Sequence, residues 1–465
     1  MFSKVIMLLA LPAVVAAQGP LVPSDTVPKR VIPRDTSLHP IPLQEAVNLA
    51  QQNYLPAIQA QGTIRSTASA VRSAYGEMLP NLNLSAGQTK SAGERLNNQT
   101  GVLNGYNGSW GYSTGLNAQL TVFDGFRARN DVRTQKANLE AANVNETSTQ
   151  FNIALQVKTQ YNLILAAEES QTAAYAQLDV AEQQFQTSVA KLTAGAANLS
   201  DSLRGVVAIG NAQLAVLQAR NTIRTASAAL TRLVGTPYFV TAVLADTAER
   251  SLPPIDSNVV VLAALRGPAV RAAEAQLNAQ IASKKAAGAA YYPTVSLSLG
   301  VTGSGTHNAY GLSPSRTDTV GTGSNRTVGV SNPFPYSHTV GVSLSYPVFN
   351  RWTRENGIVV ADVAVVNAEA TLRDQRLGAQ QNIVTQLAAL HTAEEQIRLG
   401  QINVQASQED LRVQQQRYAL GAGTLLELLT TQNALVVARQ QLITARLNYR
   451  NARAQIEAII GQDLP

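Results

Sequence analysis

Apolar residues return every seven positions over long stretches of the chain. In the second half the series is Ile383, Leu390, Ile397, Val404, Leu411 and Tyr418. After Gly421 it resumes with Leu428, Leu435, Leu442, Tyr449 and Ile456. A seven-residue apolar repeat sustained over many turns is the signature of coiled-coil packing. The pattern therefore predicts two helices that pack together as a hairpin, with the turn at Gly421.

The first half carries the same pattern, with a turn at Gly195. Its heptad positions are Val157, Ile164, Gln171, Leu178, Phe185 and Leu192, then Ser202, Ile209, Val216, Ile223 and Leu230. No proline interrupts the stretch from about Arg127 to Leu192, which as a helix would be roughly 100 Å long. The returning helix, from about Asp201 to Val234, is about half that length. A further helix, from Leu43 to about Met78, could stack on its end.

Four other segments alternate apolar and polar residues with a period of two. The apolar positions are Leu82, Leu84 and Ala86; Leu116, Ala118, Leu120 and Val122; Val295, Leu297, Leu299 and Val301; Val340, Val342, Leu344 and Tyr346. Such alternation predicts strands whose two faces meet different media, either core and water or lipid and water. Four strands cannot close a membrane barrel, because the smallest have about eight. Strands that span a membrane would therefore require oligomerisation, and a conducting pore favours three or more chains.

The two halves repeat one unit. Phe123 in TVFD corresponds to Phe349 in PVFN (349 − 123 = 226), and KLTAG at Lys191 corresponds to RYALG at Arg417 with the same offset. Upstream, Pro80 and Pro293 are 213 residues apart, so the second copy holds 13 extra residues. Loops absorb length most readily, which places them in the Gly/Ser/Thr/Asn-rich segment 303–332.

These landmarks predict the domain boundaries. Lys4, the apolar run from Val5 to Val15 and the small residues before Gln18 have the order of a secretory signal peptide. We therefore expect a signal peptide at 1–17, a Pro-rich extended segment at 18–41, a first repeat at 42–235, a connector at 236–257 and a second repeat at 258–465. The protein would be exported.

Composition narrows the function. Only 14% of residues are charged, none is Cys, and the net charge of +6 is scattered along the chain. Disulfides, thiolate metal sites and a lipidated Cys are excluded, and no basic stripe indicates nucleic-acid binding. The histidines are dispersed at positions 39, 307, 338 and 391, without metal-ligand spacing. We expect no enzyme, cofactor or metal site. No later apolar run reaches about 18 residues, so any membrane span must be built from strands.

The chain resembles the TolC-like outer-membrane efflux protein family from about residue 42 onward. The motifs are LQEAVNLA at Leu43, PNLNL and PTVSL at Pro80 and Pro293, VFDG and VFNR around Phe123 and Phe349, and RY followed by Gly421, TLLELL and Gln432. Each motif alone is weak, but together, in order and duplicated, they are specific.

The resemblance implies a mixed α+β membrane protein. Three copies would form a homotrimer with a twelve-stranded transmembrane β-barrel in the outer membrane and a twelve-helix coiled-coil tunnel in the periplasm. The helical tips would dock to a periplasmic adaptor (membrane fusion) protein and an inner-membrane transporter. The function implied is the outer-membrane channel of a tripartite export system for small molecules, such as drugs and toxic compounds, or for secreted polypeptides.

The resemblance also implies a periplasmic gate. Glu427 matches an acid that the trimer arranges in a ring, and Asp201 and Tyr418 match a hydrogen-bonded pair that holds the gate shut. The family's second ring acid falls at Thr430 and its gating arginine at Gly423, so the gate departs from the family pattern. Two other interpretations stay open: an acid early in a helix complements its dipole, and Tyr418 is a heptad core position.

Gly195 and Gly421 suit the left-handed backbone of a tight helix–helix turn. Their neighbours are the predicted adaptor contacts: Lys191, Leu192, Ala194, Arg417 and Leu420. A secreted coiled-coil structural or adhesion protein without a pore is the alternative. It would explain the heptads and the export but not the paired strands. The sequence does not separate type I protein secretion from small-molecule efflux.

Overall fold

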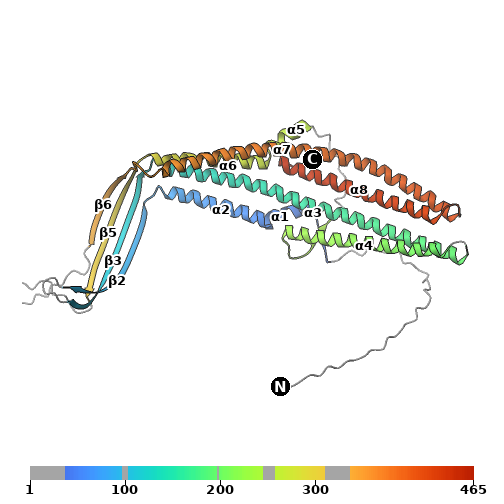
Figure 1. Ribbon diagram of the computed structural model, residues 1–465, viewed down its shortest axis with the longest axis horizontal. Helices are drawn as coiled ribbons and strands as arrows, with labels where there is room; N and C mark the ends of the chain where they lie inside the picture. The colour runs from blue at the N-terminus through green and yellow to red at the C-terminus, as the bar shows by residue number, and fades with distance from the viewer. Residues whose placement is uncertain (1–36, 97–102, 196–197, 244–256, 309–335, 465) are drawn as a thin grey trace, which may run out of the picture. The chain divides into compact units, whose positions relative to one another are not determined.

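The computed structural model describes residues 37–96, 103–195, 198–243, 257–308 and 336–464 (Figure 1). From Leu38 onward they form one compact unit. The predicted signal peptide, all but the last five residues of the Pro-rich segment, and most of the predicted 303–332 loop lie outside the described residues.

Two helical hairpins dominate the fold. The first consists of α3 (Arg127–Thr193) and α4 (Leu199–Val234), and the second of α7 (Thr353–Ala419) and α8 (Leu425–Ile460). Each outgoing helix has 67 residues and each returning helix 36. In Figure 1 the members of each pair run side by side, and α3 also packs against α8. The predicted long helices and their returning partners are confirmed.

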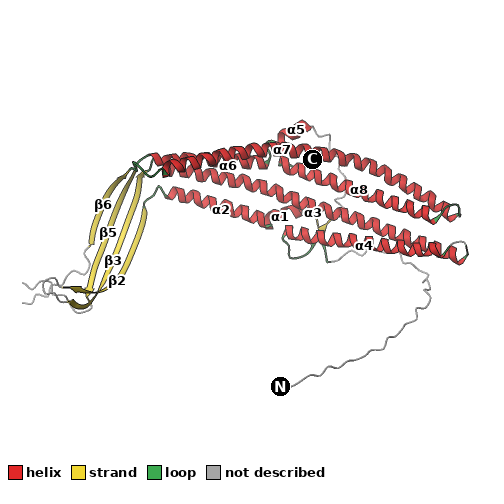
Figure 2. Cartoon of the chain, viewed as in Figure 1, coloured by secondary structure: helices red, strands yellow, loops and turns green. Residues whose placement is uncertain are grey.

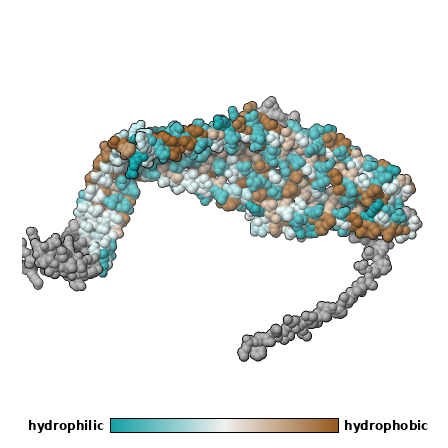
Figure 3. Space-filling view, in the orientation of Figure 1, coloured by the Kyte–Doolittle hydropathy of each residue, from teal (hydrophilic) through white to brown (hydrophobic). Residues whose placement is uncertain are grey.

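Heptad positions form the interior of these hairpins. The most deeply buried include Val157, Ile164, Leu178 and Leu230 in the first hairpin, and Ile383, Leu390, Leu428 and Ile456 in the second. Burial of one stripe per helix accounts for helices that are polar over most of their surface. On the face seen in Figure 3, apolar and polar residues are intermixed over the helical part.

The single helix expected from Leu43 to about Met78 is wrong. The structure has α1 (Leu43–Asn53) and α2 (Leu55–Gly76), separated by Tyr54 with an extended backbone (ψ 137°). Pro56 lies at the start of α2, where its missing N–H is tolerated, whereas a continuous helix would need that N–H. In the second half, α5 (Ser257–Ala264) is followed by α6 (Pro268–Ala287), which also begins with a proline, and by the 3₁₀ turn η2 (Gly288–Tyr291).

Four strands form one antiparallel sheet, as Figure 2 shows. They are β2 (Asn81–Leu96), β3 (Leu103–Phe123), β5 (Thr294–Asn308) and β6 (Tyr336–Ser345). Their order is β2-β3-β5-β6, so β2 and β6 are the edges. Each of the four alternating segments is thus confirmed as a strand.

A second, two-stranded sheet was not predicted. β1 (His39–Ile41) lies in the Pro-rich segment and β4 (Val240–Ala242) in the connector, and the two pair in parallel. Ile41 and Val240 are buried against Tyr161, whose hydroxyl donates to the Ile41 carbonyl at 3.1 Å. Among the described residues, no helix is both long and apolar enough to cross a membrane.

Candidate channel surface and gate

The register of the large sheet separates its side chains into two chemical faces. On one face the rows across the strands read Leu82–Ala118–Leu299–Val340 and Leu84–Leu116–Val301–His338. On the other they read Asn83–Asn117–Gly300–Thr339 and Ser85–Gly115–Thr302–Ser337. Because side chains alternate along every strand, aligned register makes one face largely aliphatic and the other polar.

The aliphatic face is not covered by any other part of the described chain. Leu82, Leu84 and Val340 are 68%, 75% and 73% exposed. Soluble monomers rarely leave an apolar patch of this kind open, and such patches mark membrane or protein contacts. The sheet therefore has the surface chemistry of a wall between lipid and water.

The helices expose apolar side chains too. Along α4 these are Leu203, Val206, Val207, Leu214 and Leu217, and along α7 they are Val359, Val360, Val363 and Val366. They lie outside the buried stripe within each hairpin, so they are available to another chain.

The hairpin tips turn as predicted. Gly195 has φ 73° and Gly421 has φ 76°, a left-handed conformation that follows the end of α3 and of α7. Of the predicted adaptor contacts, Ala194, Arg417 and Leu420 are exposed, Leu420 by 85%, while Lys191 and Leu192 are half-buried. The tips are thus placed as expected, and adaptor contact stays a prediction.

Glu427 caps a helix in the single chain. Its Oε2 accepts the Thr424 backbone N–H at 3.2 Å, and Thr424 Oγ1 accepts the Glu427 N–H at the same distance. This capping box satisfies donors at the start of α8, where a carboxylate also complements the helix dipole. Thr430 donates to the Leu426 carbonyl within its own helix. The ring of Glu427 carboxylates stays a prediction about the assembled protein.

Tyr418 joins the two hairpins near their tips. It is only 6% exposed. Its hydroxyl lies 3.5 Å from Ser188 Oγ of α3, and the Lys191 Nζ lies 3.8 Å from its ring centroid. Within the described residues Asp201, in the first turn of α4, is not hydrogen-bonded to Tyr418, so the predicted pairing of the two is not seen in the single chain. Neither Ser188 nor the contact of Lys191 with Tyr418 was anticipated.

A second tie between the hairpins lies at the other end of α8. Lys158 of α3 binds Glu457 and Asp463, each at 2.7 Å, and Arg453 binds Glu457 at 3.1 Å. Glu457 also accepts the Leu464 N–H at 3.3 Å, which fastens the C-terminal residues. Burial disfavours the charged form of Lys158. Hydrogen bonds to Asp463 and Glu457, together with the charges of both carboxylates, outweigh this effect and raise the pKa of Lys158.

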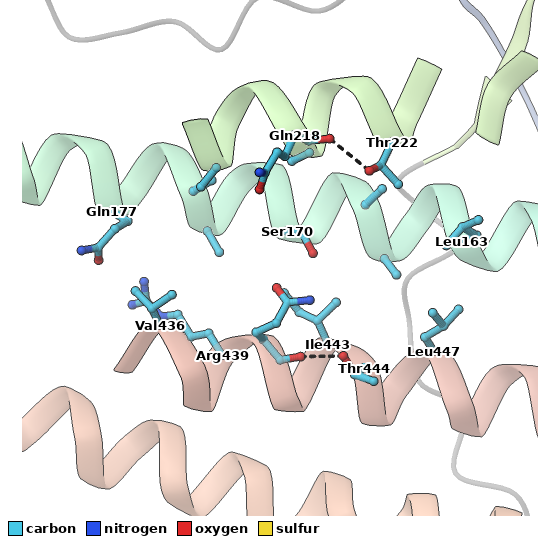
Figure 4. Close-up of a pocket in the computed structure, with 17 residues that line it drawn as sticks. Leu163, Ser170, Gln177, Gln218, Thr222, Val436, Arg439, Ile443, Thr444 and Leu447 are labelled. Atoms are coloured by element: carbon cyan, nitrogen blue, oxygen red, sulfur yellow. Dashed lines mark hydrogen bonds between the residues drawn. The ribbon is translucent and has the colours of Figure 1, made fainter. Parts of the chain in front are cut away.

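The seam between these two ties contains further polar contacts and a cavity. A cavity of about 400 Å³ lies between α3, α4 and α8. In Figure 4, Ser170 and Gln177 of α3, Gln218 of α4, and Arg439 and Ile443 of α8 border it. Much of the remaining lining is alanine. The seam between the hairpins is therefore held by polar contacts at several levels, with open space between α3, α4 and α8.

A two-faced sheet joined to coiled-coil hairpins of this length has the architecture expected of an outer-membrane channel. The family model of the outer membrane efflux protein matches residues 43–236 and 259–462. The chain belongs to this family, and the resemblance to TolC-like efflux proteins is confirmed. The family consists of transport channels rather than enzymes.

Among its relatives, protein CyaE of Bordetella pertussis is 27% identical, over 91% of this chain and 85% of that protein. The pyoverdine export outer membrane protein OpmQ of Pseudomonas aeruginosa is 25% identical, over 86% of this chain and 80% of that protein. The crystal structure of CusC has a TM-score of 0.73 at 17% identity and covers 94% of this chain and 97% of CusC. The chain is thus an outer-membrane export channel.

Proposed function

We propose that three copies of the chain close one channel that crosses the outer membrane and continues as a helical tunnel in the periplasm. The observation that carries this proposal is the four-stranded sheet, aliphatic on one face, polar on the other and open at both edges. Unpaired strand edges are not tolerated in lipid, because each unsatisfied backbone group costs several kcal/mol. Another copy has to cover each edge.

Three copies supply twelve strands, enough for an aqueous interior, whereas an eight-stranded barrel is filled by its own side chains. In the closed ring the Leu84 face would contact lipid and the Asn83 face would line the pore. The exposed apolar residues of α4 and α7 support the same assembly, since they would be covered where neighbouring chains meet.

The partners follow from the position of the tips. The α3–α4 and α7–α8 turns would dock to a periplasmic adaptor and through it to an inner-membrane transporter. Lys191, Leu192, Ala194, Arg417 and Leu420 would lie at that contact, and Glu427, Asp201 and Tyr418 at the gate. Residues 1–17 would be cleaved as a signal peptide during export.

The cargo would be small molecules or secreted polypeptides. One relative is named for pyoverdine export, and several others of lower coverage are named as toluene or antibiotic efflux pump proteins. Cargo selection would belong largely to the transporter, because the described residues on the pore face of the sheet are uncharged and form no binding site.

Cysteine cross-linking tests ring closure directly, because the chain has no cysteine of its own. Asn83→Cys on edge strand β2 is combined in turn with Ser337→Cys, Thr339→Cys or Ser343→Cys on edge strand β6. All four positions are on the polar face. At the register of the assembled barrel, oxidation is expected to give a covalent ring of three chains on denaturing gels.

The single-cysteine variants are the controls, and each can join no more than two chains. A monomeric mass in detergent, with no cross-link at any register, would overturn the proposal. In that event the apolar sheet face would need another explanation.

A further inference from the structure

The proposed function assigns Lys191 to the adaptor contact and gives no role to its contact with Tyr418. Three observations set it apart from an ordinary surface lysine. The ammonium lies over the face of a buried ring, at 3.8 Å from the centroid. It also donates a hydrogen bond to the backbone carbonyl of Tyr418. Within the described residues, Lys191 forms no ion pair with a carboxylate.

The physical chemistry of this site favours a positive charge. Tyr418 lies in the last turn of α7, whose C-cap is Leu420, so its carbonyl belongs to the negative end of the helix dipole. Lys191 lies in the last turn of α3 and meets a second negative end there. One ammonium therefore stabilises two helix C-termini and the π-face of the ring between them.

The contact joins α3 of the first hairpin to α7 of the second near the turns. Below the tips lies the cavity between α3, α4 and α8. Other polar contacts between α3 and α8 lie farther from the turns: Glu169 with Arg446 and Arg450, and Asn162 with Asn451. Near the turns, the side chains of Ser188 and Lys191 in α3 both contact Tyr418 in α7.

We propose that Lys191 is a gating residue, which holds the tip of the second hairpin against the first in the closed state and releases it on opening. The inference rests on the proposed function, because it requires a channel that closes at the hairpin tips. It assigns the closing interaction to an ammonium–ring contact within one chain. At Gly423, where the family has its gating arginine, this chain offers no side chain that could replace it.

The test measures single-channel conductance and open probability of purified trimers in planar bilayers. Lys191→Met keeps the length of the side chain and removes its charge. We expect open probability to rise by about tenfold, equivalent to about 1.4 kcal/mol. Lys191→Arg retains the cation, so its open probability should rise far less. The matched control is Arg412→Met, one to two turns before Tyr418 on α7, where the arginine pairs with Glu409 of its own helix.

A chemical rescue separates charge from packing. In Lys191→Cys, the only thiol of the chain can be alkylated with bromoethylamine, which forms a thioether and restores an ammonium at nearly the original reach. Conductance should be high before alkylation and return toward the wild-type level afterwards. Alkylation with neutral iodoacetamide should leave it high. Equal conductance before and after both reagents would overturn the proposal.

Tyr418 variants distinguish the ring from the hydroxyl. Tyr418→Leu removes the ring and should raise open probability more than Tyr418→Phe, which keeps it. Equal rises would assign the latch to the hydroxyl and favour its predicted pairing with Asp201. Trimers that conduct but do not respond to Lys191 would refute this inference alone, whereas the absence of trimers or of any conductance would refute the proposed function.

Discussion

The tips of the two hairpins have nearly the same backbone and different side-chain chemistry. Both outgoing helices have 67 residues, and both turns contain a left-handed glycine with φ near 75°. In the second tip, Thr424 and Glu427 form a capping box, whereas Asn198 at the equivalent position of the first makes no side-chain cap. Arg417 folds back onto Gln414 and the Ala422 carbonyl of its own hairpin. Its counterpart Lys191 instead reaches the other hairpin.

The difference shows that two tips with the same backbone can make different contacts, one within its own hairpin and one with the other hairpin. The second tip is stabilised by contacts within itself. In the proposed gate it would move as a unit, and the first tip would supply the side chain that holds it. The same division appears at the base of the hairpins, where Lys158 of α3 is bound to Glu457, while Val384, 226 residues later in α7, is 55% exposed.

The largest effect is expected from replacing the left-handed glycine of either turn with a residue that disfavours this backbone conformation. Gly421→Val and Gly195→Val each place a β-branched residue at positive φ, where an L-residue costs about 1–2 kcal/mol or more. No neighbouring atom lies near a Cβ built at either glycine, so the penalty is backbone strain alone. We expect Gly421→Val to abolish export while the protein stays in the membrane fraction, as measured by cargo export and immunoblot.

Gly421→Asn is the control for this substitution, because Asn tolerates the left-handed region, and it should lose less export than Val. A fully active Gly421→Val protein would refute the assignment of this turn as the docking tip. If only Gly421→Val, and not Gly195→Val, impairs export, the two tips contribute unequally to docking.

At the base of the hairpins, Lys158→Met should destabilise the helical part by about 2 kcal/mol. This is less than the 3–5 kcal/mol typical of a broken buried pair, because Arg453 still binds Glu457. Thermal or denaturant unfolding followed by helical circular dichroism measures the change. Val384→Met is the matched control and should lie within about 0.5 kcal/mol of wild type. Equal effects at both positions would show that the Lys158 tie adds nothing.

The same tie predicts a pH dependence. The pKa of Lys158 is raised above its ordinary value of 10.5 in the folded chain. The stability it contributes is therefore complete below about that pH and is lost as pH rises through the folded pKa. The stability difference between wild type and Lys158→Met should shrink at strongly alkaline pH. A difference that is independent of pH would contradict the charged form of the contact.

Capping should differ between the tips by a smaller amount. Thr424→Ala removes the side-chain acceptor of the capping box and should cost about 1 kcal/mol, whereas Asn198→Ala should cost only a few tenths. Hydrogen exchange of the first amides of α8 and α4 measures both. Similar increases in exchange at the two helix starts would show that the two tips do not differ in capping.

The smallest expected effect concerns ion selectivity. Glu427→Gln keeps an acceptor for the Thr424 N–H and removes the charge, while Glu427→Ala removes both. If the carboxylates form a ring, both variants should weaken cation selectivity and shift the reversal potential in bilayers. Unchanged reversal potentials would reject the ring and leave Glu427 as a helix cap.

Regular patterns in the sequence predicted the long elements of the fold well. Helix α3 was expected from about Arg127 to Leu192 and extends from Arg127 to Thr193. The heptad stripe made this possible, because several of its residues, including Val157, Ile164 and Leu178, are buried. The helix break at Tyr54 was not predicted, although Pro56 is a signal for it. The prediction rested on apolar spacing, which takes no account of the backbone N–H that proline lacks.

Contacts between distant segments were not predictable. Lys158 and Glu457 are 299 residues apart, and Lys191 and Tyr418 are 227 apart. Nothing in local spacing indicates that such residues meet, because the meeting depends on how one hairpin packs on another. The capping box of Thr424 and Glu427 is the exception, since its spacing of three residues is a readable signal. The short pairing of β1 with β4 was missed for the same reason of distance.

The open edges of the sheet have a consequence for biogenesis. If the chain is exported and assembles as proposed, a single copy could still form its hairpins in water, because each hairpin buries its own heptad stripe. Its sheet, in contrast, can neither enter lipid with unpaired edges nor remain long in water with Leu82, Leu84 and Val340 exposed. In the proposed trimer, membrane insertion and association of the chains would therefore be one event. The rate of that event should depend steeply on the local supply of newly exported chains, and a shortage should leave aggregation-prone precursors rather than half-built channels.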